Sequence, residues 1–383
     1  MTFSRHAKYI VLALAAASML ASCSSLNYYA QAAQGQLILL NDARPIDEWL
    51  ADHNTAPKLK LRLATARQIR AFAVHELGLP DNKSYRNYAS LARPFVLWNV
   101  VATPELSLKP VQWCFPVAGC VSYKGYYAKE DASAFAGELR AQGHDVQVGG
   151  VPAYSTLGWF NDPLISTFIF YPDAELARLL FHELSHQVVY VQDDSQFNES
   201  FASAVEEAGV ERWLNGFGND AMRDNYVKFS ARKQAFLKLL LQCRRDLEAA
   251  YAAKLSTAEK RVAKARLFQK LKEDYLVLKT SWGGFAGYDR FFAEPLSNAH
   301  LASIATYTDF IPAFRTLLAR EKTLPRFYAA AQALAELDKP ERHRRLKALA
   351  GAPAVVAASH QCASCSGLAQ IPAKPLASSP SAR

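Results

Sequence analysis

The stretch DAELARLLFHELSHQVVYV, residues 173–191, predicts a helix that carries reactive side chains through a hydrophobic core. His182 and His186 are four residues apart, so a helix presents both imidazoles on one face, with Glu183 beside the first. The neighbouring positions are apolar, namely Leu179, Leu180, Phe181, Val188 and Val189. Unpaired histidine and glutamate side chains would be costly in such surroundings, and a bound metal ion would supply the missing partner.

The spacing of these side chains is the His-Glu-x-x-His arrangement of zinc peptidases. Two neutral imidazoles leave a zinc ion room for a third protein ligand and a water, which is the open coordination of catalytic zinc sites. Glu183 would then take a proton from that water. The alternative is a buried hydrogen-bond network without a metal. The pattern therefore predicts Zn²⁺ bound by His182 and His186, with Glu183 as the general base.

A third ligand is expected from the next helix, which begins with Asn198-Glu199-Ser200-Phe201-Ala202. Glu199 lies thirteen positions after His186, and Asp193, Asp194 and Ser195 supply a turn between the two helices. An antiparallel second helix would return Glu199 to the metal. Glu206 falls two turns later on the same face, so it is either a hydrogen-bond partner of a ligand histidine or the ligand itself.

The rest of the chain divides into segments of different periodicity. Ahead of residue 173 the sequence predicts a spacer at 24–36, two or three helices at 37–79 interrupted by Pro45 and Pro57, short strands within 95–127, a helix at 131–141, and strands at 146–151 and 164–171. Behind it lie a helix at 198–213, a charged α-hairpin between Met222 and Lys279, and more helix to Leu349. We therefore expect an α+β fold, mainly α-helical, with a small mixed sheet before the histidine-bearing helix.

The N-terminus is typical of an exported protein. Arg5 and Lys8 precede an apolar run, Tyr9 to Leu20, that is too short to cross a bilayer stably. The sequence Leu20-Ala21-Ser22-Cys23 that follows resembles the lipobox of bacterial lipoproteins, which implies acylation of Cys23 and membrane attachment without a transmembrane helix. An ordinary secretory signal is the alternative, and both place the protein outside the cytoplasm. Ser24, a residue other than Asp, is associated in lipoproteins with the outer membrane.

Charge and cysteine usage agree with the cell envelope. The net charge of +9 falls to +7 without residues 1–22, and no nucleic-acid-binding module is visible, so an anionic membrane surface suits the excess as well. Cys114 and Cys120 flank a turn-forming loop, Phe-Pro-Val-Ala-Gly, and predict a local disulfide. Cys243 in a helical pattern indicates a buried free thiol. Cys362 and Cys365 form a Cys-x-x-Cys whose role the sequence does not indicate.

The two metal-binding motifs together resemble those of the glutamate zincins, in which Asn-Glu-x-x-Ala on the second helix supplies the third zinc ligand. The resemblance implies that Glu199 is this ligand, although the gap between the motifs is shorter than in the best-known members. In zincins the strand before the metal helix is a sheet edge that pairs with an extended peptide, so we expect this role for residues 164–171, with Gly149 and Gly150 permitting close approach; a buried strand is the alternative. The transition-state donor is often Tyr or His, for which Tyr307 is the candidate, followed by Tyr288 and His300.

A closer resemblance covers nearly the whole mature chain. The segments GGVPAYSTLGWFNDPL (149–164), FHELSHQ (181–187), NESFA (198–202) and NAHLASIATY (298–307) are similar to a family of bacterial lipoproteins described as zinc aminopeptidases, a description that is itself an inference. The chain then divides into a signal peptide (1–22), a lipidated Cys and spacer (23–36), a zincin-like metallopeptidase domain (37–350) and a disordered Ala/Pro/Ser-rich tail (351–383). The resemblance implies a peptide substrate and a lipid-anchored, periplasm-facing enzyme. An endopeptidase and a catalytically silent binding lipoprotein are alternatives, but a silent binder would be expected to have lost Glu183. The sequence does not indicate an oligomeric state.

Overall fold

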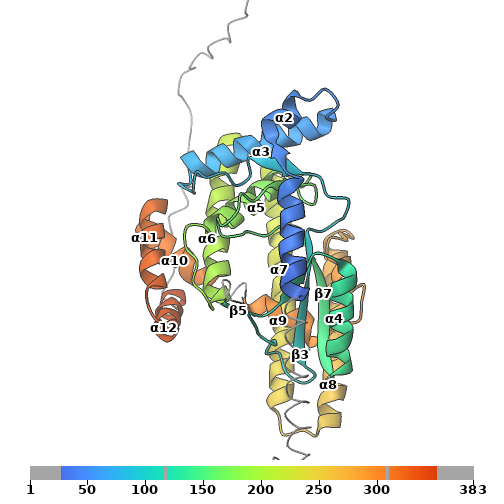
Figure 1. Ribbon diagram of the computed structural model, residues 1–383. Helices are drawn as coiled ribbons and strands as arrows, with labels where there is room; N and C mark the ends of the chain where they lie inside the picture. Colours follow the sequence, from blue (N-terminus) through green and yellow to red (C-terminus); the bar gives the residue numbers. More distant parts are fainter. Residues whose placement is uncertain (1–26, 116–118, 307–309, 352–383) are drawn as a thin grey trace, which may run out of the picture.

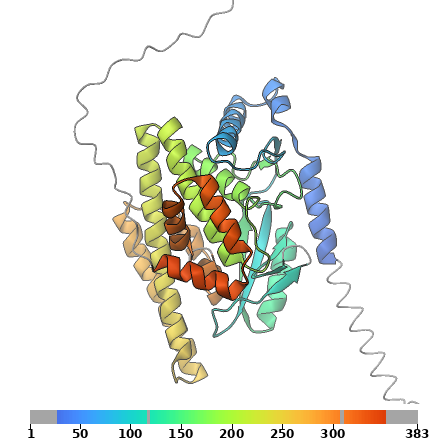
Figure 2. The same ribbon diagram turned by 90° about the vertical axis from the view of Figure 1, so that its left-hand side faces the viewer.

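The computed structural model describes residues 27–115, 119–306 and 310–351 (Figures 1 and 2). Several predicted features lie outside these residues: the signal segment, Cys23, Tyr307, and the tail from residue 352 with Cys362 and Cys365. Among the helices that are described, none is both long enough and apolar enough to cross a membrane.

The described chain combines many helices with short strands, which confirms the α+β and mainly helical prediction. The helices span residues 27–41, α2 (Ile46–Ala51), α3 (Pro57–His75), α4 (Lys129–Ala141), α5 (Asp173–Ser185), α6 (Ser195–Phe217), α7 (Asp220–Ala252), α8 (Thr257–Ser281), the 3-10 turn η1 (Asp289–Phe292), α9 (Asn298–Thr306), α10 (Ile311–Glu321), α11 (Leu324–Ala335) and α12 (Lys339–Ala350). The strands are β1 (Arg44–Pro45), β2 (Asn87–Ala89), β3 (Leu97–Pro104), β4 (Trp113–Phe115), β5 (Gly119–Val121), β6 (Lys124–Tyr126), β7 (His144–Val151) and β8 (Leu164–Ile165).

Three of the strands between 95 and 151 build an antiparallel sheet in the order β6-β3-β7, beside α4 in Figure 1, and the other two, β4 and β5, form a hairpin. Because side chains alternate along a strand, Trp98, Val100 and Ala102 of β3 pack with α4 on one face. Asn99 lies on the opposite face, where it is paired with Gly125 of β6 and Gly149 of β7. That second face is turned toward the helices that carry the predicted metal ligands.

The main hydrophobic core surrounds α5 and α6. Phe181 of α5 and Phe201 of α6 are completely buried, and the Phe201 ring stacks on Phe327 of α11 with centroids 5.6 Å apart. The charged hairpin predicted between Met222 and Lys279 is confirmed as α7 and α8, which extend past the rest of the described chain at one end in both views. It has a core of its own, to which the buried free thiol of Cys243 belongs. The helices α5 and α6, which carry the predicted histidine and glutamate ligands, therefore lie inside the largest core.

The predicted spacer at 24–36 is wrong for the residues that the structure describes, because residues 27–41 form one helix. Alanine, glutamine and leucine make up most of this helix and have high helix propensity. The helix is held on the sheet by side chains that the linear pattern does not single out: Gln31 binds the backbone of β6, and Gln36 binds the hydroxyl of Tyr127 at 2.9 Å. Residues 27–36 are thus part of the folded domain.

The predicted strand at 164–171 is also too long. Only Leu164 and Ile165 are extended, and they pair with β2 in a second small sheet. The backbone then turns, since the N–H groups of Phe168 and Ile169 both bond to the carbonyl of Ile165, at 3.3 and 3.1 Å. The turn buries the apolar side chains of Phe168 and Ile169 in the main core instead of leaving them on an edge strand.

The predicted helix 173–191 ends earlier, at Ser185, with His186 as its C-cap. Its continuation is rich in valine, and β-branched side chains lose rotamer freedom in a helix. The following helix is longer than predicted and begins three residues earlier, where the Asp194 side chain accepts a hydrogen bond from the backbone of Phe197. The turn between the two helices is therefore short and well defined.

A buried ion pair fastens this turn to α12. Asp194 and Arg342 are each at most 3% exposed, and Arg342 Nε donates to Asp194 Oδ2 at 2.8 Å, while His343 Nε2 lies 2.9 Å from the same carboxylate. We expect Arg342→Ala to lower the free energy of unfolding by about 3–5 kcal/mol, because it leaves a carboxylate buried without its main partner. Denaturant titration measures this loss. Arg344→Ala is the control on the same helix, since its exposed ion pair contributes less than about 1 kcal/mol; equal effects in the two variants would contradict the prediction.

Candidate metal centre and active site

Helix α5 places its two histidines side by side, as the sequence predicts. The rings of His182 and His186 have centroids 4.9 Å apart, and their Nε2 atoms approach to 3.3 Å. Both side chains lie largely inside the protein, with only 17% and 9% of their surfaces exposed. Two nitrogen lone pairs thus point toward the same small region at the end of α5.

Glu199 returns to this region from α6. Its carboxylate oxygens lie 3.2 Å from His182 Nε2 and 3.8 Å from His186 Nε2. The neighbouring Asn198 fixes the start of the helix, since its side-chain amide accepts from the backbone N–H of Val191 and donates to the carbonyl of the same residue, both at 2.8 Å. The Asn of the second motif therefore closes the turn, and the Glu beside it faces the histidines.

His182, His186 and Glu199 together form a group that could hold a metal ion, with one ligand atom from each residue and all such atoms within 4.8 Å of one another. The donor set consists of two imidazole nitrogens and one carboxylate oxygen, which is a combination that zinc uses in catalytic sites. In the absence of an ion, burial opposes a charge on His182, but hydrogen bonds to Glu199 and Glu206 raise its pKa to about 10. Burial lowers the pKa of His186 to about 4. The pocket thus holds one positive charge between carboxylates, which a cation can replace.

Glu206 lies behind His182 and is not part of this group. Its Oε2 is 2.9 Å from His182 Nδ1 and 3.1 Å from an Arg178 guanidinium nitrogen, and Lys233 Nζ lies 3.7 Å from Oε1. Burial alone would raise the pKa of Glu206, but the charges of Arg178 and His182 hold it at about 2. Glu206 is thus a partner of His182 and stands outside the group that could hold a metal ion.

Glu183 lines the same cavity as the ligand group but is not a member of it. Burial raises its pKa to about 7, while the charge of His182 opposes the rise. Tyr85 and Asp162 lie near it, and the hydroxyl of Tyr85 is buried without a hydrogen-bond partner among the described residues. Burial likewise raises the pKa of Asp162 to about 6. No motif of the sequence pointed to Tyr85, and Asp162 lies in the family-like segment 149–164 without a role indicated there. Both reach Glu183 only through the tertiary fold.

Two of the predicted donors are elsewhere in the molecule. Tyr288 stacks on the Phe236 ring, with centroids 4.1 Å apart, in the core of the α7–α8 hairpin. His300 is buried and accepts from the backbone of Ser297 at 3.1 Å. The lining of the cavity contains other tyrosines, of which Tyr123 and Tyr190 lie near enough to Glu199 for its charge to raise their pKa values beyond the effect of burial. Tyr190 is four residues after His186, a spacing that the sequence does offer as a signal.

The cavity in front of the ligand group has a volume of about 530 Å³. Its walls include the free face of the β6-β3-β7 sheet and the segment that follows β7, the helix 27–41, the β4–β5 hairpin and the α5–α6 pair. The predicted edge strand at 164–171 does not line it; β3, β6 and β7 do. A Cβ atom on Gly150 would collide with the Phe95 ring, so this glycine makes room for a core side chain, whereas the space beside Gly149 is open.

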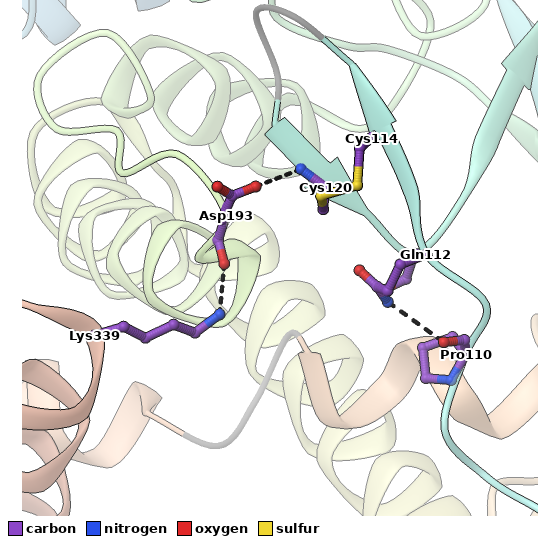
Figure 3. Close-up of a disulfide and its surroundings, with 7 residues drawn as sticks. Pro110, Gln112, Cys114, Cys120, Asp193 and Lys339 are labelled. Atoms are coloured by element: carbon purple, nitrogen blue, oxygen red, sulfur yellow. Dashed lines mark hydrogen bonds between the residues drawn. A yellow bond between two sulfur atoms is a disulfide. The ribbon is translucent and has the colours of Figure 1, made fainter.

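The hairpin β4–β5 also lines the cavity and contacts the turn between α5 and α6 (Figure 3). A disulfide joins Cys114 to Cys120, and the backbone N–H of Cys120 donates to the carboxylate of Asp193 in the α5–α6 turn. The backbone carbonyl of Asp193 accepts a hydrogen bond from Lys339 of α12. Gly119 has a φ of +72°, and a Cβ there would collide with Asp193. The hairpin therefore contacts the turn through a backbone conformation that favours glycine.

The role of Glu206 can be tested by its removal. Glu206→Gln should weaken zinc binding by roughly ten- to a hundredfold, because it loses the anion that orients His182 and strengthens it as a ligand. Titration calorimetry with a competing chelator measures this affinity. Glu207→Gln is the matched control, since Glu207 is the next residue and pairs with Arg315 at the surface. Unchanged affinity in Glu206→Gln would show that the contact with His182 has no effect on the metal.

Comparison with known proteins gives one match. The family model described as "Aminopep: Putative aminopeptidase" matches residues 27–346, which include every residue of the ligand group and the helix 27–41. Searches of curated proteins and of solved structures found no match. The matched region begins where the described helix begins and covers most of the chain. The chain therefore belongs to the Aminopep family of putative aminopeptidases.

Proposed function

We propose that this protein is a zinc-dependent peptide hydrolase that acts as an aminopeptidase. The observation that carries the proposal is the convergence of His182, His186 and Glu199 at one wall of a cavity that Glu183 also lines. Two imidazoles and one carboxylate leave zinc a free coordination position, as catalytic sites require. The family description supports peptide bonds as the target and the amino end as the point of attack.

Glu183 is the proposed general base. Its carboxylate is partly buried and lines the same cavity as the ligand group, where it can accept a proton from the attacking water and return it to the departing amine. A zinc ion held by the three ligands would supply Lewis-acid chemistry when bound. Glu206 holds His182 in the tautomer that directs Nε2 toward the ion, by accepting from Nδ1. In this proposal Glu183 is the base, the ligand group holds the metal, and Glu206 orients His182.

A hydrogen-bond donor is needed where negative charge develops on the substrate carbonyl. Tyr123 and Tyr190 line the cavity near Glu199 and, as neutral phenols, can donate. Tyr307 remains a prediction from the sequence. The order of motifs and the return of α6 alongside α5 support a zincin-like arrangement, with a thirteen-residue step from His186 to Glu199.

The proposed location is the bacterial envelope, with a lipid on Cys23 and the enzyme facing the periplasm, on the outer membrane. The support comes from the basic and apolar leader, from the lipobox-like sequence that ends at Cys23, and from Ser24 after it. Residue 27, where the family match begins, lies four positions beyond Cys23. A short connection of this kind would keep the catalytic domain close to the membrane.

The base and the ligand can be separated by two isosteric variants. Glu183→Gln should retain zinc but lose turnover by about a hundredfold or more, because the proton acceptor is removed while the ligands are intact. Glu199→Gln should lose zinc affinity and activity together, as should His182→Ala and His186→Ala. The measurements are zinc content by mass spectrometry and hydrolysis of unblocked peptides, on protein beginning after Cys23. Glu211→Gln, an exposed position on α6, is the control for side-chain changes.

Two results would contradict this assignment. Full activity in Glu183→Gln would remove the general base and with it the hydrolytic mechanism. Normal zinc content in both histidine variants would show that the metal, if bound, is held elsewhere.

The anchor is tested independently of the site. Cys23→Ser should release the protein from membranes into the soluble fraction and leave peptide hydrolysis unchanged, because lipidation and catalysis use separate parts of the chain. Cell fractionation with immunodetection measures the first effect. Membrane association that persists in Cys23→Ser would count against lipidation.

A further inference from the structure

The helix 27–41 forms one wall of the cavity. This helix contributes Tyr28 and Ala32 to the lining, while the ligand group and Glu183 form another part of the wall. A cavity of about 530 Å³ falls in the usual range for sites that enclose a small ligand or a short piece of a longer one. A substrate that reaches the ligand group therefore meets the helix after a small number of residues.

Gln31 of the same helix covers the free edge of the sheet. Its side-chain Nε2 donates to the carbonyl of Gly125 at 3.3 Å, and its Oε1 accepts from the N–H of Tyr127 at 3.1 Å. A residue of a neighbouring strand would form the same pair of bonds with these two backbone groups. The side-chain amide thus occupies the position in which an extended peptide would pair with β6, so a substrate cannot continue along this edge.

Asn99 places a polar acceptor at the end of the cavity beside the helix 27–41. It lies on β3 directly opposite Gly125, and its Oδ1 is 3.3 Å from the position that a Cβ of Gly125 would take. Asn99 lines the cavity, and its Oδ1 is buried with no hydrogen-bond partner among the described residues. A buried carbonyl without a partner is destabilising, and a donor from a bound ligand would satisfy it.

The remaining walls favour a single positive group at this end. Tyr127 and Tyr154 line the cavity, and both hydroxyls are engaged with Gln36, so these residues offer ring surface to a ligand. Aromatic rings attract an ammonium group. Apart from tyrosines, the ionisable groups among the described lining residues are those of the ligand group and Glu183. The described lining contains no arginine or lysine, and the nearest cations, Lys124 and Arg93, lie against the rings of Tyr28 and Tyr127.

We propose that this end of the cavity is the subsite for the free α-ammonium group of the substrate. Asn99 accepts a hydrogen bond from the ammonium, and the helix 27–41, with Gln31 on the sheet edge, excludes chains that extend further in the amino direction. The inference rests on the proposed function and deepens it, because it names the residues that would make the enzyme an aminopeptidase. A blocked amino end lacks the charge for this subsite, and a chain that continues in the amino direction has no room in it.

Kinetics on matched peptides test the subsite. Each peptide is offered with a free amino end and with an N-acetyl group, and kcat/KM is measured for both. The unsubstituted enzyme should prefer the free form about a hundredfold. Asn99→Leu should lower kcat/KM for the free form by about ten- to a hundredfold, because a hydrogen bond to a charged group is lost, and should leave kcat/KM for the acetylated form unchanged. Asn99→Asp, which keeps the shape and adds a charge, should increase the preference.

The wall is tested by Gln31→Ala, which should raise hydrolysis of the acetylated peptide, and cleavage of free peptides at bonds beyond the first, by about tenfold. Gln34→Ala is the matched control, because Gln34 lies on the same helix and is exposed. Equal rates on free and acetylated peptides in the unsubstituted enzyme would overturn the proposal, as would an equal loss on both in Asn99→Leu. No gain in Gln31→Ala would overturn the role of the wall.

A binding experiment separates failure of this subsite from failure of the proposed function. In the Glu183→Gln background, calorimetry should show tighter binding of the free peptide than of its acetylated form, and Asn99→Leu should abolish the difference. If no peptide is hydrolysed by the zinc-loaded enzyme, the proposed function fails; if the free and acetylated peptides bind equally, the subsite fails, whatever the activity.

Discussion

The turn between α5 and α6 is held from inside the core by two side chains, and the geometry of the site depends on it. Asp194 caps α6 and is buried against Arg342 of α12, while Asn198 bonds to both backbone groups of Val191. The geometry of each helix sets the directions of its own side chains. The conformation of the turn therefore decides whether Glu199 faces the two histidines. A single polar turn thereby converts two separate motifs into one ligand group.

Burial of charge is the second constraint on this site. Glu206 is 3% exposed, and it remains ionised because Arg178 and His182 lie against it and Lys233 lies nearby. These compensating charges come from α5 and α7, so the orientation of one imidazole depends on the packing of three helices. Removing any one partner would leave a charge in surroundings that do not solvate it, which explains why so many ionic contacts gather behind the ligand group.

The cavity joins elements that are distant in the sequence. The helix 27–41, the β6-β3-β7 sheet, the disulfide-bonded hairpin and the α5–α6 pair each provide one side. The hairpin bonds to Asp193 of the α5–α6 turn, and the helix 27–41 bonds to β6 through Gln31. These two contacts fix the positions of the hairpin and the helix as walls of the cavity. A cleft that ends at a wall suits attack near one end of a peptide, which agrees with the description of the family.

Local spacing determined what the sequence could predict. The separation of His182 and His186 sets their common face on any helix, and the hairpin at 222–279 followed from helical periodicity alone. The role of Glu206, the absence of Tyr288 from the site and the docking of helix 27–41 followed from contacts between residues far apart in the chain, which no periodicity encodes. The apolar run that reads as a strand after Leu164 was likewise decided by the core, because burying its side chains there favours a turn over an exposed edge. Spacing along the chain thus identified the two histidines and the glutamate that converge in one group, whereas the partners and walls around them depend on burial and long-range hydrogen bonds, which exist only in the folded chain.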